Sequence, residues 1–389
     1  MINPREDDVT YIGWTNFRNE NKKFGIYRAD RRYHMHLIGR SGTGKTTLMR
    51  YMIMQDFGNG EGACVIDPHG DLIESLKAEM PEHRKKEVVD FDLGNPNLDL
   101  RFNPLESTEP GRRPLIASGL IDVFKQLFGD SWGPRLEHIL RNVLLTLLDQ
   151  PVSSLEDIPR VLQDRAYSKQ ACLRVRNRHV QDFWLKEFWN YSPRFQNEAI
   201  SPVLNKIGAF LSNPVLSRVL CHEQSSFDMS TVMNDGKILL VNLSKGKVGA
   251  DSAKLIGGLL MAKMSQTAME RSNIPEQHRR DFYLYCDEFP TYSPPGMAEM
   301  LSELRKYRLS LVLAHQFLAQ LDRQVMESVL SNVGTLIAFR VGVTDAEVLE
   351  KEFYPDITAN DMVSLGTGDI YLKLMIRGKV SDVFSAESS

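Results

Sequence analysis

Two patterns of apolar and polar positions alternate along the chain. Before about residue 105, and again after about residue 236, short apolar runs end at Gly, Asn or Asp and are separated by stretches with helical periodicity. This order of strands and helices predicts an α/β domain with a doubly wound, mainly parallel central sheet flanked by helices. The predicted strands are residues 24–27, 33–38, 63–66, 87–92, 236–243, 282–286, 309–316, 335–340 and 369–375, the last as an edge strand.

Between these two regions the pattern becomes helical. Apolar positions recur three and four apart at residues 116–128, 134–149 and 197–211, which is typical of amphipathic helices. We therefore predict a polar N-terminal lead-in at 1–24, an α/β domain formed by 25–105 and 220–389, and an inserted all-α domain at 106–219. Residues 160–179 are rich in Arg, Lys and His, and they fit either a solvated helix face or a nucleic-acid contact.

Composition narrows the class of protein. The chain has 389 residues, a formal net charge of −3 and 42% hydrophobic residues, so any nucleic-acid contact must come from local basic elements. The four cysteines form no C-x-x-C pair, which argues against zinc or a disulfide framework and favours a reducing, cytoplasmic setting. No apolar run approaches the roughly 20 residues that a membrane-spanning helix needs.

A phosphate-binding loop follows the strand at 33–38. Residues 39–46 fit the pattern G-x-x-x-x-G-K-[ST], and a helical stretch comes next. The backbone N–H groups of such a loop converge on phosphate oxygens at a helix N-terminus. Lys45 is then expected at the β- and γ-phosphates and the Thr46 hydroxyl at Mg²⁺. The alternative is a glycine-rich turn with an incidental lysine. The predicted nucleotide-binding residues are Gly39, Ser41, Gly42, Thr43, Gly44, Lys45, Thr46 and Thr47.

Polar side chains at later strand ends supply the remaining chemistry. Asp287 and Glu288 follow a buried apolar run, and we expect Asp287 to hold Mg²⁺ through water and Glu288 to polarise the attacking water. The alternative is an ordinary acidic turn. Gln316 ends the next strand and can contact both phosphate and water. Two arginines are candidates to stabilise transition-state charge from a neighbouring subunit, Arg305 and, more weakly, Arg340.

Three further features stay open. Asp67 ends an apolar strand and fits either a turn or the site, and Asp71 could cap the following helix. Gly25 and Ile26 fit edge-strand packing or a place beside a nucleotide base. The basic loop at 244–249, with Lys245 and Lys247, fits either a pore element that grips phosphates or a surface turn.

Several motifs occur together in one order and carry a family resemblance. They are residues 39–46, 65–72, 102–105, 287–288, 304–307 and 314–316. The chain resembles the FtsK/HerA superfamily of DNA-pumping ATPases, and within it the coupling proteins of conjugative type IV secretion, which carry a helical domain inserted in the motor. The resemblance implies a RecA-like P-loop NTPase fold. It also matches Lys45, Thr46, Asp287, Glu288, Gln316 and Arg305 to the family's functional residues.

The resemblance implies an ATP- and Mg²⁺-dependent translocase that acts as a hexameric ring on DNA without sequence specificity. A relaxase or a membrane secretion channel is the expected partner, in the cytoplasm or at the inner membrane. Alternatives are a HerA-type repair translocase, an ATPase that unfolds or exports protein, and a nucleotide-gated docking protein that recruits a relaxase or protein substrate.

Overall fold

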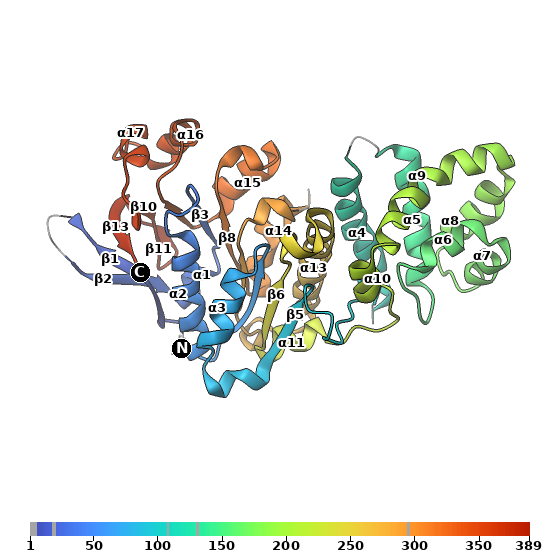
Figure 1. Cartoon of the computed structure of the whole chain (residues 1–389), viewed down its shortest axis with the longest axis horizontal. Helices are drawn as coiled ribbons and strands as arrows, with labels where there is room; N and C mark the ends of the chain where they lie inside the picture. The colour runs from blue at the N-terminus through green and yellow to red at the C-terminus, as the bar shows by residue number, and fades with distance from the viewer. Residues whose placement is uncertain (1–5, 18–20, 107–108, 130–131, 294–295) are drawn as a thin grey trace. The chain divides into compact units, whose positions relative to one another are not determined.

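The chain folds into two compact units. The computed structural model describes residues 6–17, 21–106, 109–129, 132–293 and 296–389 (Figure 1). The first unit comprises residues 1–91, 230–244 and 267–389, and the second comprises 92–229 and 245–266. Compared with the predicted domains, the second unit also includes residues 92–105, 220–229 and 245–266. Residues 1–5 and 18–20 of the predicted lead-in, and 107–108 and 130–131 of the predicted helical domain, lie outside the described residues.

The first unit is built on a sheet of 11 strands in the order β2-β1-β13-β10-β9-β3-β8-β7-β4-β6-β5. Strands β9, β3, β8, β7, β4 and β6 pair in parallel, and β10, β13, β1 and β2 continue the sheet in antiparallel fashion. The strands are β1 (Val9–Thr15), β2 (Lys23–Tyr27), β3 (Met35–Ile38), β4 (Gly62–Asp67), β5 (Val88–Asp92), β6 (Ile238–Asn242), β7 (Phe282–Cys286), β8 (Leu309–His315), β9 (Thr335–Ala338), β10 (Asp369–Lys373) and β13 (Phe384–Ser388). A separate hairpin pairs β11 (Met375–Ile376) with β12 (Lys379–Val380).

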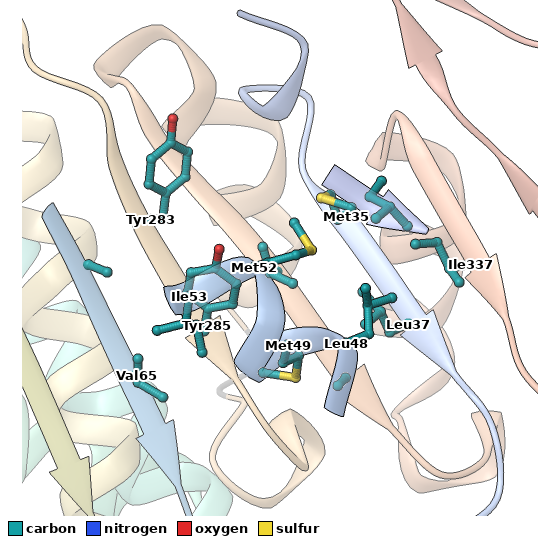
Figure 2. Packing of buried hydrophobic residues seen from close by; sticks show 14 of the residues in the cluster. Met35, Leu37, Leu48, Met49, Met52, Ile53, Val65, Tyr283, Tyr285 and Ile337 are labelled. Carbon is teal, nitrogen blue, oxygen red and sulfur yellow. The ribbon is translucent and has the colours of Figure 1, made fainter. Parts of the chain in front are cut away.

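Helices cover both faces of this sheet. The central strands are buried along their whole length, as their continuous apolar sequences require. Alternate residues of a strand face opposite sides, so Leu37 and Ile337 pack with α2 and α3, whereas Ile38 and Ala338 pack with α16 and α17. Figure 2 shows α2 side chains, including Met49 and Ile53, lying over Tyr285 and Leu37. The helices are α1 (Arg28–Arg31), α2 (Lys45–Gly58), α3 (Asp71–Glu79), α11 (Met229–Asp235), α14 (Met297–Glu303), α15 (Arg323–Asn332), α16 (Val343–Phe353) and α17 (Ala359–Val363).

Two expectations about the sheet edges were wrong. The predicted lead-in contains β1, which pairs with β2 on one side and β13 on the other. The closing strand β10 is not an edge, because β13 lies beside it. Both β1 and β13 mix buried with exposed or half-buried positions, so their apolar signal is weak. The edges are β2, as predicted from residues 24–27, and β5.

The second unit is helical. Its core is formed by apolar side chains at helical spacing, such as Leu140, Val143 and Leu147 of α5, and the buried Trp184 donates from Nε1 to the Thr146 hydroxyl at 2.7 Å. Its helices are α4 (Arg113–Phe128), α5 (Pro134–Leu148), α6 (Asp157–Gln163), α7 (Arg165–Cys172), α8 (Arg178–Asp182), α9 (Pro193–Leu211), α10 (Pro214–Leu220), α12 (Lys245–Val248) and most of α13 (Ala250–Glu270). The expected basic loop is thus mainly the short helix α12, because residues 245–248 close a helical turn. None of the helices in the described ranges combines the length and the apolar character needed to cross a membrane.

The predicted fold class is confirmed: a RecA-like α/β fold whose mainly parallel central sheet is flanked by helices, with an all-α part contributed by the middle of the chain.

Candidate nucleotide site

The phosphate loop connects β3 to α2 at the carboxyl edge of the parallel strands. Gly44 has φ of 117°, a conformation that only glycine adopts readily, and α2 begins at the next residue. Gly39 is needed for space, because a Cβ there would lie 2.5 Å from Cβ of Phe339. The loop is tied to both neighbouring strands, since Gly39 N–H donates to His315 O at 3.3 Å and Arg40 N–H to Arg340 O at 2.9 Å.

Lys45 lies inside this loop rather than on its surface. Its ammonium donates to the carbonyls of Gly39 and Arg40 at 2.5 and 3.0 Å, and the residue is only 6% exposed. Burial lowers the pKa of Lys45, although Asp287 and Glu288 act to raise it. The ammonium is therefore held where a polyphosphate would reach the loop. Thr43 is buried with it, while Ser41, Gly42, Thr46 and Thr47 are exposed.

Thr46 and Asp287 meet across the sheet edge. The Thr46 hydroxyl donates to Oδ2 of Asp287 at 3.0 Å. Burial raises the pKa of Asp287, the Thr46 hydrogen bond opposes this, and the nearby carboxylates of Asp67 and Glu288 raise it further. A carboxylate with this environment gains from a cation beside it.

The donor set fits Mg²⁺ bound together with a nucleotide. Within the described residues, no group of three or more His, Cys, Asp or Glu side chains could hold a metal alone. Mg²⁺ commonly uses one or two protein oxygens, substrate phosphates and water. The hydroxyl of Thr46 and the carboxylate of Asp287 supply such oxygens next to the phosphate loop.

Glu288 is held by two glutamine side chains. Gln316 donates from Nε2 to one carboxylate oxygen at 2.6 Å, and Gln320 donates to the other at 3.3 Å. Glu288 itself has φ of 49°, in the left-handed region that costs free energy for a residue with a side chain. Gln320 was not predicted from the sequence. It lies in a short 3-10 turn, where no periodicity marks it, and its Oε1 accepts the N–H groups of Gln316 and Phe317, both at 3.1 Å.

Asp67 and Asp71 lie at the start of α3, where their roles are structural. The Asp67 carboxylate accepts backbone N–H groups from His69, Leu72 and Ile73 at 2.8 to 3.3 Å, which satisfies the start of α3. Asp71 is the first residue of α3 and does not cap it, because the N-cap is Gly70 with φ of 99°. The turn interpretation of Asp67 therefore holds, while its charge still acts on Asp287.

A buried histidine pair lies behind the acids. The Nε2 atoms of His36 on β3 and His315 on β8 are 2.8 Å apart, and the ring of Phe289 is within 5.1 Å of His315. Burial lowers the pKa of His36 to about 3 and that of His315 well below its ordinary value. His315 is thus a packed residue, while its neighbour Gln316 reaches the acids.

The two candidate arginines lie on opposite edges of the sheet. Arg340 follows β9, and its carbonyl contacts the phosphate loop through Arg40. Arg305 precedes β8, so it lies at the amino edge, away from the phosphate loop of its own chain. Its guanidinium stacks on the ring of Tyr33 at 3.3 Å from the centroid. The structure therefore brings together Lys45, Thr46, Asp287, Glu288 and Gln316, but not Arg305.

Comparison with known proteins adds two family models and several solved structures. Residues 24–110 match the type IV secretion-system coupling protein DNA-binding domain, and residues 281–351 match the TraM recognition site of TraD and TraG. The plasmid coupling protein TrwB in complex with ADP and Mg²⁺ is 14% identical, with a TM-score of 0.68 over 100% of this chain and 90% of that chain. The chain has the fold of a coupling-protein-like P-loop NTPase.

A second TrwB structure, with a non-hydrolysable ATP analogue, gives a TM-score of 0.66 at 15% identity over 93% of this chain and 86% of that chain. VirB4 of Thermoanaerobacter pseudethanolicus gives 0.65 at 12% identity over 98% and 96% of the two chains. A search of curated proteins found no match. The resemblance drawn from the sequence motifs is confirmed by the two family models and by the shared fold.

Proposed function

We propose that this chain is an ATP-hydrolysing DNA translocase that works as a ring of identical subunits and is the motor of a conjugative DNA-transfer system. The observation that carries the proposal is the convergence at the carboxyl edge of the sheet. The Thr46 hydroxyl lies 3.0 Å from the Asp287 carboxylate, and the Gln316 amide lies 2.6 Å from Glu288. These residues come from three separate parts of the chain and meet beside Lys45.

Each side chain has a distinct task in hydrolysis. Lys45 and the loop N–H groups bind and orient the polyphosphate. Mg²⁺, held by the Thr46 hydroxyl and through water by Asp287, would offset the charge of the β- and γ-phosphates. Glu288 accepts a proton from the attacking water, and Gln316 orients both partners. The two glutamine contacts hold the Glu288 carboxylate in place.

Charge that develops on the γ-phosphate in the transition state calls for a positive group besides Lys45. Arg305 is exposed and lies at the amino edge of its own sheet. Because a group there cannot reach the phosphate loop of the same chain, we infer that it serves the nucleotide of a neighbouring copy. A ring in which every subunit offers Arg305 to the next would complete each site, and a hexamer is the size we expect.

DNA is the proposed substrate. The match of residues 24–110 to a coupling protein DNA-binding domain supports this choice. The exposed basic side chains of the helical unit offer phosphate contacts, and binding through the backbone would be weakly sequence-specific and sensitive to salt. These side chains are Arg160, Arg165, Lys169, Arg174, Arg176, Arg178 and His179.

The decisive experiment measures ATP turnover with and without single- and double-stranded DNA. Wild-type protein should hydrolyse ATP faster when DNA is present. Lys45→Ala should lose nucleotide binding, and Glu288→Gln should bind ATP without turning it over. Glu327→Gln, a matched change of an exposed glutamate on α15, should behave as wild type. Normal turnover by Glu288→Gln would refute the catalytic assignment.

A docking role is the second candidate, because residues 281–351 match a region described as a recognition site for another protein. In that case ATP would hold the ring together and recruit a protein partner without pumping DNA. ATP turnover that stays flat with both forms of DNA, together with ATP-dependent capture of a relaxase, would favour this function over translocation.

A further inference from the structure

A basic cavity of about 570 Å³ lies at the amino edge of the sheet. It is bordered by the segments that precede β3 and β8 and by the turn of the β11–β12 hairpin. Its cationic lining residues are Arg32, Arg305, Lys306, Arg308 and Arg377. The phosphate loop, by contrast, follows β3 at the opposite edge, so a nucleotide bound there is out of reach of this cavity in the same chain.

Arg377 lies in the turn of the β11–β12 hairpin. Arg377 and Gly378 form its two-residue turn with φ of 49° and 75°, the pattern of a type I′ turn. The buried Asp30 carboxylate accepts the N–H groups of both residues, at 2.6 and 2.8 Å. A Cβ placed on Gly378 would lie 3.4 Å from the Tyr33 hydroxyl. The two hydrogen bonds fix the turn to α1 and give the backbone of Arg377 a defined place.

Two arginines that line the cavity lie over tyrosine rings. The Cζ atom of Arg305 is 3.3 Å from the ring centroid of Tyr33, and Cζ of Arg377 is 5.5 Å from the ring centroid of Tyr27. Both are exposed, and among the described residues neither forms a salt bridge with a carboxylate. Stacking orders a guanidinium while leaving its N–H donors available for an anion.

The other charges of the cavity are already engaged. Arg32 pairs with Asp281 at 2.7 Å, and Lys306 pairs with Glu303. Arg308 donates to the carbonyl of Arg279 at 2.9 Å. Of the two acidic lining residues, Asp30 is bound to the turn, and Glu276 is exposed. The positive charge that remains for a ligand therefore belongs mainly to Arg305 and Arg377.

We propose that Arg377 is a second arginine acting on the nucleotide of the neighbouring subunit, beside Arg305. The inference rests on the proposed function, since it needs an assembly in which this edge meets the phosphate loop of another copy. The ligand is the polyphosphate of that nucleotide. A cavity of this volume suits a small molecule, and arginines that line one cavity are suited to phosphate recognition.

Hydrolysis then draws on both arginines. Arg305 follows the sequence pattern of the family's trans-acting arginine, whereas Arg377 enters from a hairpin near the C-terminal end of the chain. Asp30 acts as a positioning residue for Arg377, because its carboxylate holds the turn without touching the ligand.

The test uses Arg377→Asn in the full chain. Asn-Gly is the favoured pair for a type I′ turn, so this change removes the guanidinium without weakening the hairpin. We expect ATP turnover to fall about 10- to 100-fold, the effect of losing a hydrogen bond to a charged group. Binding of a fluorescent ATP analogue to the phosphate loop of an isolated protomer should be unchanged. Lys379→Ala, an exposed lysine on the same hairpin outside the cavity lining, is the matched control and should match wild type.

Mixing two variants shows whether Arg377 acts between subunits. Glu288→Gln protein keeps Arg377, and Arg377→Asn protein keeps Glu288. Mixed rings therefore contain sites with both groups, and the mixture should hydrolyse ATP faster than the sum of the two proteins alone. If Arg377→Asn protein proves misfolded, Arg377→Lys takes its place, with a partial loss of turnover expected because lysine keeps the charge but not the fork of donors.

Four results would overturn the inference. Wild-type turnover by Arg377→Asn or a mixture no more active than its parts would exclude a trans role while leaving the proposed function intact. Normal turnover without DNA, with loss only of DNA affinity and of its salt dependence, would instead assign Arg377 to DNA phosphates. Wild-type protein without any ATPase activity would overturn the proposed function and this inference together.

Discussion

The two edges of the parallel sheet carry different functional groups, although the same strands run between them. The carboxyl edge carries the phosphate loop and two acids, and the amino edge carries arginines. At the carboxyl edge, β3 ends in the phosphate loop and β7 ends in Asp287 and Glu288. At the amino edge, β8 begins after Arg305 and the hairpin turn places Arg377. In the proposed account neither edge is sufficient, because the acids and the arginines of one copy cannot reach the same phosphate. Assembly would therefore be a requirement for turnover.

Removal of Arg305 from the amino edge is expected to have the largest effect. Arg305→Ala should lower turnover by about 10³-fold or more, the range found for arginines supplied in trans to a transferring phosphate. Affinity of the protomer for ATP should stay the same, because Arg305 lies away from its own phosphate loop. Steady-state kinetics and analogue binding measure the two quantities. If Arg305→Ala weakened ATP binding by the protomer as much as it slowed turnover, Arg305 would belong to the site of its own chain.

Glu288 tests the carboxyl edge. Glu288→Gln keeps the shape of the side chain but removes the base, so turnover should fall about 10²- to 10⁴-fold. ATP binding should persist, since Lys45 and the loop are untouched. A single-turnover assay separates the two effects. Retained turnover would show that Glu288 only stabilises the turn that follows β7.

Much of this site could be predicted because strand ends in a parallel sheet share one edge. Apolar strands that end in Asp287 or Gln316 therefore had to bring those residues near the phosphate loop. The antiparallel strands could not be found in the same way. β1 and β13 are partly exposed, so their sequences carry little apolar signal. Gln320 and Arg377 sit in turns, where pairing and backbone geometry set their positions rather than any periodic pattern.

Gln320 offers a smaller test of the same edge. Gln320→Leu removes the contact to Glu288 and leaves the N–H groups of Gln316 and Phe317 without their acceptor. We expect turnover to fall about 10-fold, in line with the cost of a lost hydrogen bond to a charged group, with KM for ATP little changed. Gln324→Leu, an exposed glutamine on α15, is the control. An unchanged rate would mean that Gln316 alone positions Glu288.

The histidines between the two edges predict a dependence of stability on pH. Burial lowers the pKa of His34 to about 4 and that of His36 to about 3, and His315 is shifted in the same direction. The unfolded chain therefore binds more protons below about pH 6.5, and stability present above that pH is lost as the pH falls. Each histidine adds a slope of up to about 1.4 kcal/mol per pH unit.

Urea unfolding at pH 7 and pH 5.5 measures this slope in a window where most carboxylates stay ionised. The free energy of unfolding should be lower at pH 5.5. His83→Gln, at an exposed position, should show the same slope as wild type. Equal stability at both pH values would mean that the three buried rings do not remain neutral in the folded protein.

The most direct measurement is a structure of the Glu288→Gln protein assembled with ATP, Mg²⁺ and DNA. We expect a closed ring with ATP on Lys45 of each subunit and the guanidinium of the next subunit's Arg305 about 3 Å from the γ-phosphate. This expectation would be contradicted by an assembly in which ATP occupies that loop while Arg305 of every copy faces solvent, far from any phosphate.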